Sequence, residues 1–372
     1  FYGKTGNDVD AITTLEKDFA SKELKPKETD EISFDYFAGG DGSQANPYLV
    51  STPEQIKLIN ARASMKDCYK SFTEERSQII TSPISQTISL SSGTITYNKI
   101  YFKQTQDLTL EFTDILITGD FEGEYDGDSK VITINAKNGE YAAISRSESS
   151  LGDKIDFTKG VALFKNIAAG GEVKNFMINV SFTNEVGENT IFAAVATENN
   201  GTISNITING FAFAFKSFVT NGGCFISGIV GVNNGLVEDC KNEANINIST
   251  HSNQTSMILS IASIASVNNG QLIGCGNEGN IVASVNGQVR ARVSGIVGYN
   301  TGRIFMCYNS ATIQASFNGN NVGNAAGIVL YSSKAGDISY VFNQGKIYGV
   351  KGNCGGIAYI SNKIMENVFA YG

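Results

Sequence analysis

The sequence predicts an all-β protein folded as a parallel β-helix with three strands per coil. Three observations predict it: a long-period repeat, a turn-rich composition and a recurring Asn-Gly turn. The back half of the chain repeats at intervals of 30–35 residues, and a glycine marks each copy. These marker glycines are Gly171, Gly201, Gly235, Gly270, Gly302 and Gly336. A fixed period of this length indicates one supersecondary unit stacked on copies of itself.

Apolar residues recur at two fixed distances after each marker glycine. Two positions on, the residues are Val173, Ile203, Val237, Leu272, Ile304 and Ile338. Five positions on, they are Phe176, Ile206, Cys240, Cys275, Cys307 and Val341. Equivalent positions of successive coils lie about 4.8 Å apart in a parallel stack, so both sets are predicted to form interior rows. The three stacked cysteines are therefore predicted to be reduced and buried, in preference to a disulfide or a metal site.

Composition and turns favour β structure. The 372 residues include 40 glycines, 4 prolines and no tryptophan, and 41% of the chain is hydrophobic against 17% charged, which argues against disorder. The turns between coils read Asn200-Gly201, Asn234-Gly235 and Asn269-Gly270, and both residue types tolerate positive φ at a sharp corner. The amphipathic pattern of a helical solenoid and the signature of leucine-rich repeats are both missing.

Each repeat divides into three predicted strands. In the copy after Gly235 they are residues 236–240, 245–250 and 257–267, with a polar loop at 251–256 between the last two. Residues 141–160 break the pattern, and we expect a loop extending from one coil there.

Three regions are predicted along the chain. Residues 1–33 are polar and lack apolar periodicity, so we expect a flexible tether. Residues 34–85 are predicted to be a capping segment with one helix, and residues 86–372 the β-helix itself. A helix over the first coil would cover strand edges that are otherwise unpaired.

The cap helix has a clear start signal. Thr52 suits the N-cap, Pro53 the first helical position, and Gln55 the third position of a capping box. Ile56, Ile59 and Ala63 then fall on one face, which we expect to pack on the β-helix.

Charge and hydropathy exclude some functions. The net charge is −8, and 26 of the 36 carboxylates lie in residues 1–160, with no basic cluster for nucleic-acid binding. No apolar run is long enough to span a membrane. The chain starts at Phe1 without an apolar leader, and we expect an export signal or lipid anchor upstream, with the mature protein extracellular or at the cell surface.

Short motifs carry a family resemblance over about residues 37–372. Residues 228–235 read Gly-Ile-Val-Gly-Val-Asn-Asn-Gly and residues 295–302 read Gly-Ile-Val-Gly-Tyr-Asn-Thr-Gly. These segments resemble the GLUG motif of bacterial surface proteins, and residues 46–55 and 121–127 resemble two further segments common in such proteins. The resemblance implies a right-handed β-helix of the Bacteroidetes type on an exported protein. It supplies no catalytic residues.

The densest acidic cluster is Glu122, Glu124, Asp126 and Asp128. One interpretation is a turn that orders the first coils. The others are a bound cation, with Asp126 and Asp128 as ligands, and catalysis by paired carboxylates. We assign no catalytic residue and expect no cofactor.

Tyr299, Tyr331 and Tyr359 recur on three consecutive predicted coils. An exposed tyrosine row suits contact with sugar rings, whereas a half-buried row would only stabilise the stack. The sequence therefore predicts a non-catalytic exported β-helix scaffold for adhesion or for binding a glycan or host ligand. The alternative is a polysaccharide-processing enzyme, a lyase or glycosidase. The expected partner is a polysaccharide or host surface glycoprotein, not nucleic acid, and the chain is predicted to be a monomer.

Overall fold

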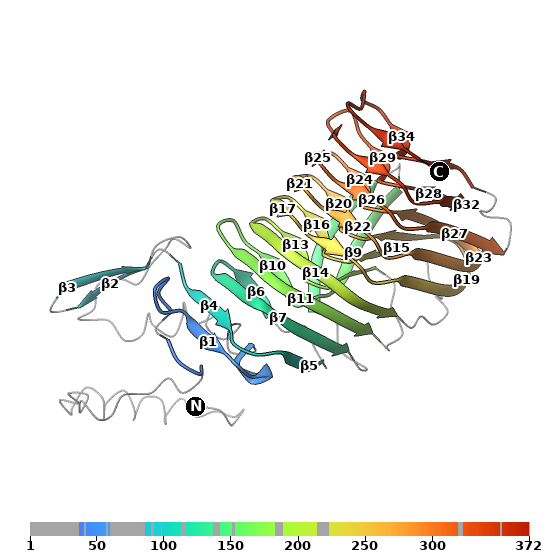
Figure 1. Cartoon of the computed structure of the whole chain (residues 1–372). Helices are drawn as coiled ribbons and strands as arrows, with labels where there is room; N and C mark the ends of the chain where they lie inside the picture. The colour runs from blue at the N-terminus through green and yellow to red at the C-terminus, as the bar shows by residue number, and fades with distance from the viewer. Residues whose placement is uncertain are drawn as a thin grey trace.

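The protein is an elongated stack of β coils that runs from the blue N-terminal end to the red C-terminal end (Figure 1). The computed structural model describes residues 37–40, 42–56, 59, 86–90, 93–97, 99–112, 117–136, 142–150, 153–182, 189–213, 223–318, 323–349 and 352–371. The predicted tether and much of the predicted capping segment lie outside these residues. The strands stack in parallel, so the prediction of a parallel β-helix is confirmed.

Within the described residues, a 15-stranded first sheet forms one long side of the coils. Its main path is β1 (Tyr48–Val50), β4 (Tyr101–Gln104), β7 (Glu124–Ala136), β11 (Glu172–Phe182), β14 (Thr202–Phe213), β18 (Lys241–Asn242), β22 (Gly276–Asn277), β26 (Tyr308–Asn309), β31 (Phe342–Asn343) and β35 (Phe369–Ala370). Joined to this path are β5 (Leu108–Phe112), β17 (Leu236–Glu238), β21 (Gln271–Ile273), β25 (Arg303–Phe305) and β30 (Asp337–Ser339).

The second sheet has 8 strands among the described residues, one from each coil that it crosses. They are β6 (Ile117–Phe121), β10 (Phe164–Ile167), β13 (Ala196–Asn199), β16 (Val230–Asn233), β20 (Ala265–Asn268), β24 (Val297–Asn300), β29 (Val329–Ser332) and β34 (Ala358–Ser361).

The third sheet has 10 strands in the same part of the chain and completes each coil. They are β8 (Ala142–Ser150), β9 (Asp153–Val161), β12 (Thr190–Ala193), β15 (Gly223–Ser227), β19 (Ile246–Ala262), β23 (Ile281–Ser294), β27 (Ile313–Asn318), β28 (Asn324–Ala326), β32 (Ile347–Gly349) and β33 (Cys354–Gly355).

The predicted interior rows are confirmed. Val237 pairs in register with Leu272, and Leu272 with Ile304, and all three are fully buried. Cys240, Cys275 and Cys307 are free thiols with no exposed surface. The amide of Gly276 donates to the Cys240 carbonyl, and that of Tyr308 to the Cys275 carbonyl, which fixes the order of the row. The repeat frame in the sequence is therefore the structural register.

The marker glycines are needed because the turn leaves no room for a side chain. The sequence analysis had instead attributed them to positive φ. None of Gly201, Gly235, Gly270 and Gly302 has positive φ. A Cβ on Gly235 would collide with the Gly201 carbonyl oxygen, and one on Gly270 would collide with that of Gly235. Successive coils approach so closely at this turn that only glycine fits.

The positive-φ corner lies four residues after each marker glycine. Its residues are Asn175, Asn205, Asp239, Gly274, Met306 and Tyr340, with φ between 49° and 66°, and Asn367 at φ 51° follows in the last coil. Asn, Asp and Gly are the residues that favour this conformation, whereas Met and Tyr are not. The corner lies inside the long strands β11 and β14 in the earlier coils, and between the separate strands β17 and β18 in the coil after Gly235.

Two ladders of asparagine side chains run inside the stack, and the sequence analysis missed them. The first joins Asn199, Asn233, Asn268 and Asn300 through amide hydrogen bonds of 2.8 Å each, and ends on Ser332. The second joins Asn242, Asn277, Asn309 and Asn343 at 2.6–2.7 Å. The signal was present, because each ladder keeps one fixed distance from the marker glycines.

The predicted division of the coil after Gly235 is partly wrong. Strand β19, of 17 residues, continues through the predicted loop at 251–256 and pairs along its length with β23, of 14 residues. The register shifts between Ser252 and Met257, which accommodates the extra residues of β19. The predicted strand at 257–267 is divided between two sheets, because β19 ends at Ala262 in the third sheet and the next residues form β20 of the second sheet.

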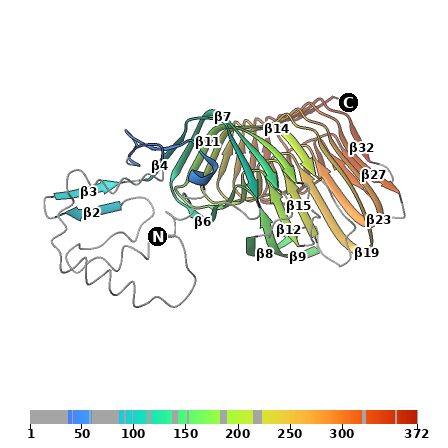
Figure 2. The same cartoon turned by 90° about the horizontal axis from the view of Figure 1, so that it is seen from below.

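Residues 141–160 also differ from the prediction. Instead of a loop, β8 and β9 form an antiparallel hairpin whose second strand pairs in parallel with β12 (Figure 2). At the N-terminal end, β2 (Gln86–Leu90) and β3 (Gly93–Tyr97) form another antiparallel hairpin.

The described start of the cap agrees with the sequence. Residues 53–56 are helical. The Gln55 side chain accepts hydrogen bonds from the amides of Ser51 and Thr52, and the Gln55 amide donates to the Thr52 hydroxyl, as in a capping box. Ile56 and Ile59 are buried in the main core, while Ala63 lies outside the described residues. Strand β1, within the predicted capping segment, is itself the first rung of the first sheet.

Candidate functional site

Three members of the acidic cluster, Glu124, Asp126 and Asp128, lie on β7, and Glu122 lies just before this strand. Phe121 and Tyr125 point into the core, so the acids between and after them point outward. Asp128 and Ser129 have positive φ, at 48° and 61°, and form a turn inside the strand.

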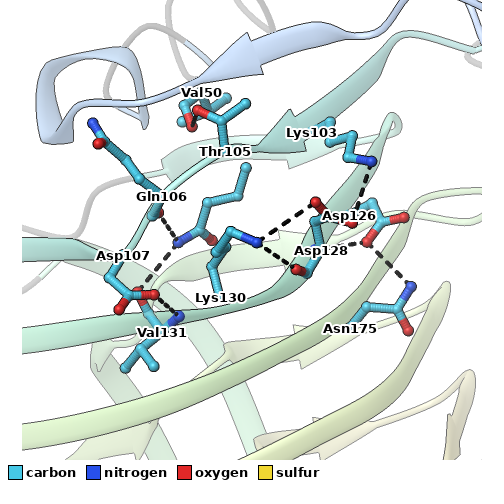
Figure 3. Close-up of polar contacts among 11 residues, drawn as sticks. Val50, Lys103, Thr105, Gln106, Asp107, Asp126, Asp128, Lys130, Val131 and Asn175 are labelled. Atoms are coloured by element: carbon cyan, nitrogen blue, oxygen red, sulfur yellow. Dashed lines mark hydrogen bonds and ion pairs between the residues drawn. The ribbon is translucent and has the colours of Figure 1, made fainter.

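Asp126 and Asp128 have different contacts at this turn. Asp126 Oδ1 accepts hydrogen bonds from the Asp128 amide at 2.9 Å and from Asn175 Nδ2 at 3.1 Å. The Asp128 carboxylate lies 3.2 Å from Lys103 Nζ and 3.7 Å from Lys130 Nζ (Figure 3). Two lysine ammonium groups therefore already pair with Asp128, one of the two predicted cation ligands.

These contacts match the turn-ordering interpretation of the acids. Within the residues that the structure describes, no three His, Cys, Asp or Glu side chains gather as a metal site would require. A cation held by Asp126 and Asp128 remains a prediction, and it would have to displace the two lysines.

A second group of charges lies beside this turn. Glu124 and Glu172 are direct neighbours in the register of β7 and β11. Lys174 Nζ lies 2.8 Å from both carboxylates, and Lys99 Nζ lies 3.2 Å from Glu172 and 3.8 Å from Glu124. Two like charges so close would repel, and the two lysines neutralise them.

The pKa values of this group follow from burial and hydrogen bonding together. Burial alone would raise the pKa of Glu172, but hydrogen bonds from Lys174 and Lys99 outweigh it and hold the pKa below its usual value. Burial would lower the pKa of Lys174, but its hydrogen bonds to Glu124 and Glu172 raise it instead. Glu172 is thus kept ionised, and it is not held protonated as the general acid of a glycosidase would be.

The predicted tyrosine row is right for two of its three members. Tyr299 on β24 and Tyr331 on β29 pair in register, with ring centroids 5.0 Å apart and ring planes within 6°. Tyr331 then pairs with Ile360, so Tyr359 lies one residue out of register. The cause is spacing, because Tyr331 lies four residues after Gly327 and Tyr359 only three after Gly356.

The tyrosine pair continues a buried row on the outer side of the second sheet. Val232 and Val267 precede Tyr299 in register and are fully buried against Phe225 and Ile258. Tyr299 packs on the edge of that cluster and remains half-buried, as does Tyr331. Asn362 Nδ2 donates to the Tyr331 hydroxyl at 2.8 Å.

The orientation of this pair changes how it can bind. Parallel rings one coil apart turn their faces toward each other, so the ring edges and hydroxyl groups face outward. The predicted stacking of sugars on successive ring faces does not fit this geometry. Contact through hydroxyl groups and ring edges does.

The first sheet carries further aromatic residues that the sequence analysis did not single out. Tyr308 and Phe342 stack at 5.3 Å and 11°, and the Tyr308 hydroxyl donates to Glu278 Oε1 at 2.6 Å. Their equal distance from Gly302 and Gly336 was the available signal.

Comparison with known proteins assigns this chain to no family. No protein-family model matches the chain, and no curated protein matches it. Among solved structures it is similar to a putative immunoglobulin A1 protease from Bacteroides ovatus, at 14% identity, covering 78% of this chain and 80% of that one, with a TM-score of 0.33. A likeness of this size shows no shared activity.

No helix among the described residues is long and apolar enough to cross a membrane.

Proposed function

We propose that this protein is a non-catalytic scaffold, exported and displayed at the cell surface, that contacts a glycan or host glycoprotein through the outer face of its second sheet. The proposal includes membership of the GLUG-motif surface proteins that the sequence resembles. The observation that carries it is the parallel, half-buried pair of Tyr299 and Tyr331.

The pair supports binding because the outer row to which it belongs is fully buried in the preceding coils and becomes partly exposed at the two tyrosines. In the coils before it, Val232 and Val267 are covered completely, whereas Tyr299 and Tyr331 keep part of their surface open. Tyrosine presents an apolar edge and a hydroxyl group together, which suits a ligand that has both kinds of surface. Each contact of this kind is weak, so useful affinity would depend on many copies displayed together.

The acidic residues favour a scaffold over the enzyme alternative. Glu124 and Glu172 lie side by side, as catalytic carboxylates do, but both are ion-paired with lysines. Asp128 is likewise paired with Lys103 and Lys130. A glycosidase needs one carboxylate held protonated as its general acid, whereas the lysines hold the pKa of Glu172 below its usual value.

A glycan array probed with the wild-type protein tests the proposal, followed by variants of the tyrosine pair. Tyr331→Ala should weaken binding to any glycan bound by the wild type, and Tyr331→Phe should show how much the hydroxyl contributes. Tyr359→Ala is the matched control, because this tyrosine lies outside the register of the pair. Release of reducing ends from a polysaccharide panel would favour the enzyme instead.

A further inference from the structure

The corner of the first sheet contains two residues that its conformation disfavours. Successive coils place Asp239, Gly274, Met306, Tyr340 and Asn367 at this corner, all with positive φ. Bulky side chains in the left-handed region are outliers, and such outliers concentrate at functional sites. Two adjacent coils therefore keep large apolar residues where the others have small or polar ones.

Both side chains are open to solvent. Met306 and Tyr340 each expose 56% of their surface. They are exposed on the side of the stack and not at its end, because Gly274 precedes them and Asn367 follows them in the same row. Burial does not account for the choice of these residues.

The ring of Tyr340 is oriented differently from the stacked pairs. It meets Phe305 of the preceding coil at 5.4 Å and 72°, edge to face. Tyr299 and Tyr331, by contrast, lie parallel and turn their faces toward each other. Since Tyr340 does not stack on a neighbour and is more than half exposed, it can present a ring face to a ligand.

Charged groups of both signs lie beside Phe305, the ring that Tyr340 contacts, and on the strand that leads to Tyr340. The Arg303 guanidinium lies 4.3 Å from the centre of the Phe305 ring, and its Nε lies 3.9 Å from Asp337 Oδ2. Lys363 Nζ lies 3.4 Å from Asp337 Oδ1. Hydrogen-bond donors and acceptors thus lie within one coil of the exposed aromatic surface.

We propose that Tyr340, with Phe305 and Met306 beside it, is a second binding site, at which the ring face of Tyr340 receives one pyranose ring of a glycan. Arg303 and Asp337 hydrogen-bond the hydroxyl groups of that sugar. A pyranose has an apolar C–H face and a polar rim, which matches one aromatic face bordered by charges. A protein partner is the poorer match, because the centre of a protein interface is depleted of charged residues. The site takes its ligand class from the proposed function but uses different residues on a different sheet.

Affinity gel electrophoresis of the full 372-residue chain tests the proposal. The gels contain laminarin, xylan, mannan or gastric mucin, and retardation gives the affinity. Tyr340→Asn removes the ring and places at the corner the residue found in other coils. We expect about threefold to tenfold weaker binding, with a melting temperature equal to or above that of the wild type. Tyr340→Phe, which keeps the ring, should bind within twofold of the wild type.

The matched control is Tyr348→Ala, which removes a comparably exposed tyrosine from β32 of the third sheet and should leave binding unchanged. Unchanged binding by Tyr340→Asn overturns the second site, and if Tyr331→Ala still weakens binding, the proposed function stands without it. Weaker binding by Tyr340→Asn with no effect of Tyr331→Ala supports this site alone. If the wild type is retarded by none of the four glycans, both proposals fail.

Discussion

The side-chain amide of Asn268 donates to Oδ1 of Asn300 across 2.8 Å, and both side chains are fully buried. Asn268 also accepts a hydrogen bond from Asn233 at 2.8 Å, so one residue joins three coils. The ladder pairs polar groups that would otherwise be unsatisfied inside the stack.

Replacement of Asn268 by Ala should therefore destabilise the protein strongly. It leaves the buried Asn300 acceptor without its donor, at a cost of about 1–3 kcal/mol. It also removes one of the three hydrogen bonds of Asn233 Nδ2, whose others go to the Gly235 and Gln271 carbonyls. Urea denaturation followed by circular dichroism measures the change. The comparison is Asn234→Ala, because Asn234 is exposed and its side chain bonds with those of Asn200 and Asn269 on the surface. This change should cost less than about 0.5 kcal/mol. Equal losses in the two variants would contradict a special role for the interior ladder.

A methyl group on Gly270 should also be poorly tolerated. The added Cβ would overlap the Gly235 carbonyl and the Asn234 backbone, which cannot move without separating two coils. We expect a loss of about 1–3 kcal/mol or more in the free energy of unfolding. Gly274→Asn is the comparison, because Gly274 occupies the positive-φ corner and an added Cβ there would overlap only the carboxylate of Asp239, a side chain that can rotate away. This second change should cost clearly less than the first.

The buried cysteines should be inert in the native protein. Burial raises the pKa of the Cys240 thiol to about 12, so the reactive thiolate is almost unpopulated at pH 8. Maleimide labelling with peptide mapping should modify the exposed Cys354 and leave Cys224, Cys240, Cys275 and Cys307 unmodified until denaturant is added. Native labelling of Cys275 at the rate of Cys354 would show that the interior row is wrong.

The ion pairs of Glu172 should stabilise the protein at neutral pH and contribute less at acidic pH. Its pKa is held below the usual value of 4.5, so its contribution is present above that pH and is lost as pH falls through the lowered value. Glu172→Gln should therefore lower the melting temperature at pH 7 and have a smaller effect near pH 3. Glu243→Gln, in an exposed ion pair with Lys241, should change little at either pH. A Glu172→Gln deficit that grows on acidification would contradict this account.

The sequence alone determined the repeat frame and the interior of the protein. The rows through Val237 and Cys240 follow from like residues at one period, because a solenoid stacks equivalent positions directly on one another. The capping box at Thr52 and Gln55 was also readable, since it is a local contact within one turn.

Tertiary structure decided which neighbours each row meets and which way its side chains face. A difference of one residue in spacing moves Tyr359 out of the row of Tyr299 and Tyr331, because side chains alternate between faces along a strand. The marker glycines are required by the close approach of two coils, which no single repeat contains. The edge-to-face contact of Tyr340 is likewise made with Phe305 of the preceding coil, outside its own repeat. The fold could be predicted from a period, whereas the outer surface had to be read from the packing of one coil on the next.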